Sequence, residues 1–561
     1  MVKKYILIVA ILLSDCAPRS LVQPSLSSPP PAMVQPSPSA TQSRSPVDSP
    51  GRDVPALWIS SAVPASLHQA ALKWGLPIVF DSANSNLQLD IDTAPFWEGD
   101  QKVDWVYVLV APFPTVVDGV SSQDLMDDWH GSSSRPFAGK PLLMDIATLT
   151  AFSKVWGPPA AGVVRTGPAE QLVDIAWQKR PSWAIVPFEK LDPRWKVLAV
   201  DGNSPIHKDF DTSRRMLLQT VIEYPLMISF GLHCSDPCPV SPLPALPPPN
   251  RDLSKMTTVV MTGTTSLVRG TAYMMNTKGI TYPARDIQDW LTQADITHLS
   301  NEVSFYGGCP PQTIDMKGLQ FCSDPHFIGL LKYAGVDVVE LTGNHLIDYG
   351  PQSFLDTLSL YRQNNILYYG GGADLDEARK PLLIQNHGNK IAFIGCNTVN
   401  IGQYPTAAQD RPGAAPCDYD YVTQQITQLR NQGYLVIMTF QYYEVYDSLP
   451  LVSQVNDFRL MAQAGASVVQ GSQAHYPQSM DFYNGAFIHY GLGNLFFDQM
   501  GDDPKMPAIR REFLDRHVFY DGRYVSTELL TAMLEDYSRP RPMTDDERAA
   551  FLTEYFSDSG W

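Results

Sequence analysis

An amide and an imidazole directly follow one apolar segment of this chain, in the sequence Thr342-Gly343-Asn344-His345. The preceding run, 336–341, has the apolar, β-branched composition of a buried strand. In open α/β folds the ligand site lies beyond the carboxyl ends of the strands, so these side chains stand where chemistry is expected. The alternative is structural, because an asparagine in this position also caps turns. The spacing marks a candidate site and leaves its activity open.

The elements that would position this site alternate between strands and helices in the second part of the chain. Strands are predicted at 256–263, 296–299, 336–341, 390–395, 435–440 and 467–471. Helices are predicted at 287–294, 327–334 and 353–364, and before each of the last two strands. This alternation is typical of an α/β fold. Another helix is predicted at 544–555, in a tail that either packs on the second part or mediates contacts.

The first part of the chain, 55–238, shows the same alternation. Strands are predicted at 106–111, 162–165 and 183–187, and helices at 121–131, 147–156 and 168–179. The order of a strand, a serine-led helix ending in Trp-x-Gly and a later Trp-Ala-Ile-Val-Pro run resembles the type 2 periplasmic binding-protein fold. The resemblance implies a cleft for a small polar ligand. A spacer domain without a pocket is the alternative.

The net charge limits the kinds of partner that this chain can bind, and its proline content indicates where the domains are separated. The chain has 58 acidic and 41 basic side chains, a net charge of −17, which argues against nucleic acid as a partner. The proline-rich stretches 17–54 and 239–255 favour linkers, because they cannot bury enough apolar area to fold alone. We therefore expect a signal segment at 1–16, a linker at 17–54, domains at 55–238 and 256–543 separated by a linker at 239–255, and a helical tail at 544–561.

The N-terminus has the pattern of an export signal. Lys3 and Lys4 precede a short apolar run, 5–13, that is too short to span a membrane comfortably. The run ends in Leu-Ser-Asp-Cys16, which resembles the bacterial lipobox, although Asp15 departs from the small residue usual there. The resemblance predicts an extracytoplasmic protein anchored to the bacterial membrane by a lipid on Cys16. Simple secretion and an uncleaved anchor remain as alternatives.

The six remaining cysteines fall into three near pairs. An even count at short separations in an exported chain suggests local disulfides. The expected pairs are Cys234 with Cys238, Cys309 with Cys322, and Cys396 with Cys417. Buried free thiols are the alternative, and a structural zinc site is disfavoured because no second close pair matches zinc-ribbon spacing.

Several segments of the second part resemble the CapA family, the capsule or poly-γ-glutamate synthesis proteins. The run Leu341-Thr-Gly-Asn-His-Leu-Ile-Asp-Tyr-Gly350 is similar to the Asn-Asn-His-x-x-Asp-Tyr-Gly segment of that family. Further similar segments follow in the family's order at 369–372, 391–395, 464–471 and 490–499. The resemblance implies a four-layer αββα fold like that of calcineurin-type metallophosphoesterases, in which strand-end side chains bind two divalent metals.

Transferred to this sequence, the family's ligand set is incomplete. The resemblance implies catalytic roles for Glu302, Asn344 and His345, with His345 as leaving-group acid, and metal ligation by these three and His475, with Glu444 as an additional ligand. Mn, Fe, Zn or Mg would suit such ligands. Uncharged side chains replace or shift the other expected ligands: Thr264, Ser300, Gln441 and Ser472. These four, with Arg269, Asn494 and Asp498, are expected to line the pocket.

Three activities remain open for this pocket: a two-metal centre, a single-metal or altered site, and binding without turnover. Glu302 could also form a purely structural ion pair with Arg269. The resemblance predicts a surface-anchored protein that acts on or holds an anionic envelope polymer, which would be a metal-assisted hydrolase if it cleaves. The alternative is a solute receptor for a small polar ligand, in which the second domain is an inactive enzyme fold.

Overall fold

The computed structural model describes residues 54–92, 101–132, 136–137, 139–210, 224–235, 238–399, 404–501 and 509–561. Residues 52–561 form one compact unit. The predicted signal segment, Cys16 and nearly all of the first linker lie outside the described residues.

One sheet of the second part has eight strands, in the order β15-β14-β13-β11-β24-β25-β26 with β12 beside β13. Its parallel strands are β11 (Met256–Thr262), β12 (Thr264–Thr265), β13 (Ile296–Asn301), β14 (Val338–Glu340) and β15 (Leu367–Tyr369). Its antiparallel strands are β24 (Arg511–Tyr520), β25 (Arg523–Glu535) and β26 (Arg539–Pro542).

A second sheet has six strands, in the order β17-β18-β20-β21-β23-β22. These are β17 (Leu382–Asn386), β18 (Asn389–Asn397), β20 (Leu435–Gln441), β21 (Val468–Ser472), β22 (Met480–Tyr483) and β23 (Ala486–His489). Strands β18, β20, β21 and β23 run parallel, as buried strands joined by helical crossovers do. A short pair, β16 (Gly371–Gly372) and β19 (Gly413–Ala414), stands apart.

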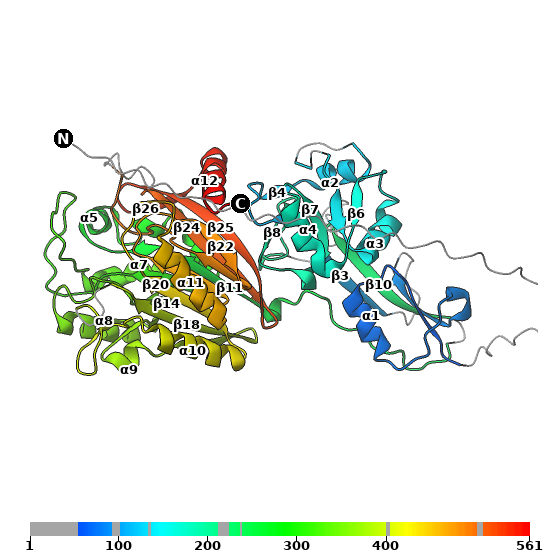
Figure 1. The fold of residues 1–561 in the computed structure, drawn as a ribbon, viewed down its shortest axis with the longest axis horizontal. Helices are drawn as coiled ribbons and strands as arrows, with labels where there is room; N and C mark the ends of the chain where they lie inside the picture. Colours follow the sequence, from blue (N-terminus) through cyan, green and yellow to red (C-terminus); the bar gives the residue numbers. More distant parts are fainter. Residues whose placement is uncertain are drawn as a thin grey trace, which may run out of the picture. The chain divides into compact units, whose positions relative to one another are not determined.

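The two sheets pack face to face through a shared apolar core. Val259 and Ile296 of the first sheet join Phe393, Ile437 and Phe487 of the second in one buried cluster. Helices cover the outer face of the eight-stranded sheet: α5 (Arg269–Lys278), α6 (Gln288–Thr292), α7 (Ile328–Tyr333) and α8 (Pro351–Gln363). Helices α10 (Tyr419–Asn431) and α11 (Val452–Ala464) cover the other sheet, beside β18 and β20 in Figure 1. The predicted αββα arrangement is confirmed.

The first part is a single eight-stranded sheet in the order β1-β2-β10-β3-β7-β5-β6, with β8 beside β3. The strands are β1 (Leu57–Ile59), β2 (Leu87–Ile91), β3 (Gln101–Pro112), β5 (Leu142–Met144), β6 (Val164–Thr166), β7 (Trp183–Pro187), β8 (Trp195–Val197) and β10 (Met227–Cys234). Its helices are α1 (Ala65–Leu72), α2 (Ser122–Trp129), α3 (Ile146–Trp156) and α4 (Leu172–Gln178). β4 (Gly119–Val120) and β9 (Ala199–Val200) form a separate pair.

Local sequence signals explain where the predicted helices begin and end. Helix α2 starts at a capping box, in which Ser121 and Asp124 each accept a hydrogen bond from the other's backbone N–H. It ends before Gly131, which has a φ of +86° that favours glycine. The predicted α/β character of the first part is confirmed.

The second proline-rich stretch lies along the first part. Residues 239–250 form no helix or strand, as the proline spacing predicts. The side chains of Leu243 and Leu246 nevertheless pack against the core of the first part. Asn250 is buried, and its side chain exchanges two hydrogen bonds of 2.8 Å with the backbone of Val106 on β3. This segment therefore packs along the surface of the first part through Leu243, Leu246 and Asn250.

The C-terminal region contributes more to the core than its sequence predicts. A long hairpin, β24 and β25, turns at Asp521-Gly522, where both φ values are positive as in a type I′ turn. The predicted last helix is α12 (Asp545–Asp558), and its Phe551 and Tyr555 are buried in the shared core. The short helix α9 (Leu375–Ala378) completes the helices of the second part.

All three predicted disulfides are present: Cys234–Cys238, Cys309–Cys322 and Cys396–Cys417. Within the part of the chain that the structure describes, none of the helices has the length and apolar character needed to cross a bilayer.

Candidate functional site

The predicted site residues gather where parallel strands of both sheets end. Glu302 follows β13, Asn344 and His345 follow β14, and Gln441 and Ser472 are the last residues of β20 and β21. These strands run in the same direction within each sheet, so their carboxyl ends share an edge.

Close backbone packing fixes the loop that carries Asn344 and His345. A Cβ atom at Gly343 would lie 2.6 Å from the backbone of Glu302, closer than such contacts occur. Only glycine permits this approach without a backbone shift. Gly343 therefore brings the loop after β14 against the residue that follows β13.

A network of amide side chains joins the two sheets. The Gln441 amide nitrogen donates to Asn344 Oδ1 over 3.1 Å and also donates to the side-chain oxygen of Gln473. The Ser472 hydroxyl donates to Gln441 Oε1 over 2.9 Å. The backbone N–H of Gln473 donates to the Thr264 hydroxyl over 3.2 Å. Five residues from four separate segments of the chain thus form one polar cluster, in which all but the half-buried Asn344 are buried.

The two histidines of the site have different partners. His345 Nδ1 lies 2.8 Å from Asp348 Oδ2. Burial alone would lower the pKa of His345, but the hydrogen bond to Asp348 and the charges of Glu302, Asp348 and Glu444 outweigh it and raise this pKa. His475 Nδ1 lies 2.9 Å from Asn494 Oδ1, and its Nε2 lies 3.9 Å from Glu302 Oε2. Glu302 is therefore the acidic group that both histidines share.

Two predicted pocket residues, Arg269 and Asp498, pair with each other, and a third, Ser300, pairs with a buried carboxyl. The predicted pair between Arg269 and Glu302 is wrong, because Arg269 binds Asp498 through contacts of 2.5 and 3.1 Å. Asp498 also accepts the Gly270 N–H over 2.9 Å, so it fixes the start of α5. The Ser300 hydroxyl hydrogen-bonds the buried carboxyl of Glu340, beneath the amide network.

Three further residues contribute to the site: Gln473 was missed in the sequence, and Asp348 and Tyr446 were not predicted as ligands or pocket residues. Gln473 completes the amide network, Asp348 holds His345, and the Tyr446 hydroxyl donates to Glu444 at the exposed rim. Burial and the hydrogen bond to Glu444 raise the pKa of Tyr446, and the charges of Glu444 and Glu302 act in the same direction. Asp348 lies at the i+3 position from His345 inside the family motif, and its contacts with His345 and with the Phe321 N–H anchor this loop.

These residues do not fit a dinuclear metal centre. Among the described residues, no three His, Cys, Asp or Glu side chains are placed to hold a metal ion. The oxygen of Asn344 that would face a cation accepts the Gln441 amide, and the oxygen of Asn494 faces His475. A two-metal site needs anionic side chains around its cations. Here the neutral Gln441 N–H group occupies the position next to Asn344 Oδ1 that a cation would take.

A family comparison matches this region of the chain. Residues 258–499 match the model of the bacterial capsule synthesis protein PGA_cap. The PGA biosynthesis protein CapA of Bacillus subtilis (strain 168) is 30% identical over 184 residues, which are 33% of this chain and 48% of that protein. The chain spans about half to three-fifths of the length of the curated relatives that it matches.

Two solved structures are similar to parts of this chain at low values. A phosphatase from Mycoplasma pneumoniae is 14% identical, with a TM-score of 0.33, over 50% of this chain and 94% of that chain. An ABC-type phosphate transport receptor from Vibrio cholerae is 10% identical, with a TM-score of 0.26, over 32% of this chain and 87% of that chain. At these values the likenesses add nothing to the fold that the sheets themselves establish. The family match, together with the predicted motif in its predicted place, shows that the 258–499 region of this chain belongs to the CapA (PGA_cap) family of capsule synthesis proteins.

Proposed function

We propose that this protein takes part in the synthesis of an anionic envelope polymer of the capsule or poly-γ-glutamate type, and that its site holds the polymer without cleaving it. The main support for this proposal is the amide network of Gln441, Gln473 and Asn344 at the edge where the parallel strands end. In this region the chain belongs to a family of capsule synthesis proteins.

The chemistry of the network supports a polyamide ligand. Both N–H donors of Gln441 bind within the network, where they orient Asn344 and Gln473 through their side-chain oxygens. The amide N–H groups of Asn344 and Gln473 complement the C=O groups of an amide-linked backbone. Glu302 and Asp348 are acidic, so carboxylates of the polymer would have to point away from them toward solvent. Recognition would therefore depend on the amide groups of the polymer, and the net charge of −17 would weaken long-range attraction.

A binding experiment tests this proposal with poly-γ-glutamate of defined length and the full chain. Gln441→Ala removes hydrogen bonds at the centre of the network and is expected to weaken binding about tenfold. Gln463→Ala, on the exposed side of α11, is the matched control and is expected to leave the affinity unchanged. Equal affinities for the Gln441→Ala and unmodified proteins would contradict the proposal.

A metal measurement separates holding from hydrolysis. Mass spectrometry of protein purified from metal-supplemented medium is expected to find less than about 0.1 divalent metal per chain. A full equivalent of metal that His475→Gln removes would favour a divergent hydrolase, with His345 as the leaving-group acid. That result would overturn the proposal of binding without turnover.

A second candidate function is solute reception by the first part of the chain. A cavity of about 460 Å³ lies beside the starts of α1 and α3, lined among others by Asp145, Glu170, Glu189 and Lys190. Three carboxylates against one lysine favour an amine over an oxyanion. Thermal-shift measurements on the full chain are expected to show stabilisation by basic amino acids or polyamines and none by phosphate. Stabilisation by phosphate alone would contradict this candidate.

We also propose that a lipid on Cys16 anchors the protein to the outer side of the bacterial membrane. The support is the resemblance of its sequence context to a lipobox. Cys16→Ala is expected to release the protein from the membrane fraction, with Cys238→Ala as a control that should stay bound. A Cys16→Ala protein that remains membrane-bound would favour the uncleaved anchor.

A further inference from the structure

The loop closed by the Cys309–Cys322 disulfide lies directly against the candidate site. Its residues 310–320 form no helix or strand and are largely exposed, with Leu319 81% exposed. Phe321, which precedes the second cysteine, is buried, and its ring lies against the His345 ring of the site. Within the loop that the disulfide closes, the exposed residues therefore end at a buried side chain, Phe321, next to Cys322.

Phe321 contacts His345 in two ways. Its ring lies 4.6 Å from the His345 ring, edge to face. Its backbone N–H donates to Asp348 Oδ2 over 2.8 Å, and the same oxygen lies 2.8 Å from His345 Nδ1. Gln320 also donates to the backbone oxygen of Asp348 over 2.6 Å. The loop therefore holds the residue that orients His345 as well as the imidazole itself.

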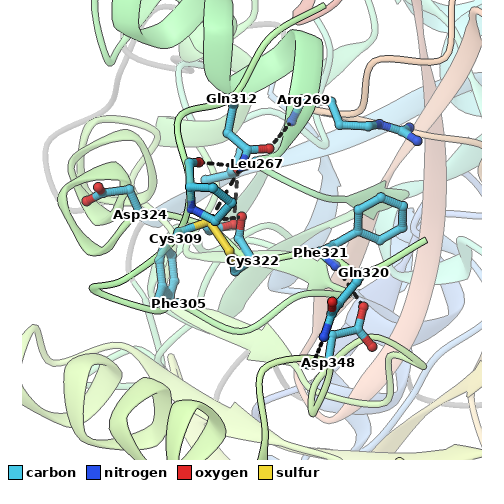
Figure 2. Close-up of a disulfide and its surroundings, with 12 residues drawn as sticks. Leu267, Arg269, Phe305, Cys309, Gln312, Gln320, Phe321, Cys322, Asp324 and Asp348 are labelled. Carbon is cyan, nitrogen blue, oxygen red and sulfur yellow. Dashed lines mark hydrogen bonds between the residues drawn. A yellow bond between two sulfur atoms is a disulfide. The ribbon is translucent and has the colours of Figure 1, made fainter. Parts of the chain in front are cut away.

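The opposite side of Phe321 is held by Arg269. The guanidinium lies 4.9 Å from the Phe321 ring and 5.2 Å from the ring of Phe497, which stacks on His475 at 5.0 Å. The backbone N–H of Arg269 donates to Gln312 of the loop over 2.8 Å, as Figure 2 shows. The disulfide loop, Arg269 and both histidines thus belong to one continuous set of contacts.

We propose that the loop closed by Cys309–Cys322 is a clamp that positions His345, with Phe321 as the positioning residue. A disulfide limits the conformations open to the chain between its cysteines, and Phe321 is adjacent to one of them. Without this restraint the loop can withdraw the ring and the N–H that hold Asp348 and His345. The role of His345 in ligand binding rests on the proposed function. The position of the His345 ring can be measured without any ligand.

Nuclear magnetic resonance of protein labelled at histidine Cε1 reads the position of the ring directly. His345→Gln identifies the His345 signal by its disappearance. The spectra are recorded near pH 9, where histidines are neutral, so that a moved signal reports surroundings instead of protonation. The other histidines serve as internal references.

Two pairs of variants make the test specific. The His345 signal is expected to move in the double variant Cys309→Ser with Cys322→Ser, and to stay in place in Cys234→Ser with Cys238→Ser. It is expected to move in Phe321→Leu and to stay near its original place in Phe321→Tyr, which keeps the aromatic ring. If the first double variant fails to fold, the two Phe321 variants decide the outcome.

Hydrogen exchange provides a second readout. The Phe321 amide is expected to exchange roughly tenfold faster in Asp348→Asn, because it loses a charge-assisted hydrogen bond. An unmoved His345 signal in Phe321→Leu, or an equal shift in Cys234→Ser with Cys238→Ser, would overturn the clamp. Either result can occur whether or not the protein binds a polymer, so the two proposals fail separately.

Discussion

At the scale of single residues, Gly343 determines whether the site can form. A Cβ atom there would meet the Glu302 backbone at 2.6 Å, so Gly343→Ala must push apart the loops that carry Glu302 and His345. We expect the free energy of unfolding to fall by about 1–3 kcal/mol in urea titrations. Gly307→Ala, which has no atom within 4 Å of its new Cβ, is expected to change it by less than about 0.5 kcal/mol. Equal stabilities of both variants would contradict this account.

Glu512 shows the cost of a buried carboxyl. It is fully buried, and burial raises its pKa well above the ordinary value. Because this pKa is raised, the Glu512 carboxyl favours the folded state most below its unfolded-state pKa. This contribution to the free energy of unfolding is lost as the pH rises through the folded-state pKa. Glu512→Gln is therefore expected to be about 1–2 kcal/mol more stable than the unmodified protein at pH 8, with a smaller difference at pH 4. Urea titrations at both pH values test this, and a less stable variant at pH 8 would contradict it.

At the scale of elements, the last helix is part of the second domain's core. Thr544 accepts the N–H of Glu547 in a capping box, and Phe551 and Tyr555 are buried. Thr544→Ala is expected to lower the free energy of unfolding by about 1 kcal/mol. Thr553→Ala, on the exposed face of the same helix, is expected to be neutral or slightly stabilising. A lower midpoint of thermal denaturation for Thr553→Ala than for Thr544→Ala would contradict the role of the Thr544 cap.

At the scale of the whole molecule, ion pairs connect the first part with the second. Glu528 of β25 lies 2.7 Å from Arg516 and 3.3 Å from His207 of the first part. Burial opposes both shifts, but His207 and Arg516 lower the pKa of Glu528 to about 2, and the Glu528 carboxylate raises the pKa of His207. A lowered carboxyl pKa gives stability that is present above the unfolded-state value and is lost as the pH falls toward 2.

Acid denaturation tests this connection. Glu528→Gln is expected to cost on the order of 1–3 kcal/mol at pH 7 and to lose less stability than the unmodified protein between pH 5 and pH 3. Glu170→Gln removes an exposed pair with Lys190 and is expected to have no measurable effect. Parallel acid profiles for Glu528→Gln and the unmodified protein would show that this carboxylate does not stabilise the fold.

The sequence alone determined the α/β character of both parts, three strands of the first part and six of the second, the three disulfides and the segment that carries Asn344 and His345. These features depend on local periodicity, cysteine spacing and short motifs, all of which are contiguous along the chain. The hairpin β24–β25 was predictable in principle from Asp521-Gly522, but its alternation is obscured because both faces of β24 are buried.

Only the tertiary structure decided the partners of the site residues. An ion pair of Arg269 with Glu302 was one alternative in the sequence, but Arg269 binds Asp498, which lies more than two hundred positions away. Gln441 became the centre of the amide network because two sheets that are separate in the chain end at one edge. Such contacts follow from how the layers pack, and packing depends on the whole set of buried side chains, which no short stretch of sequence contains.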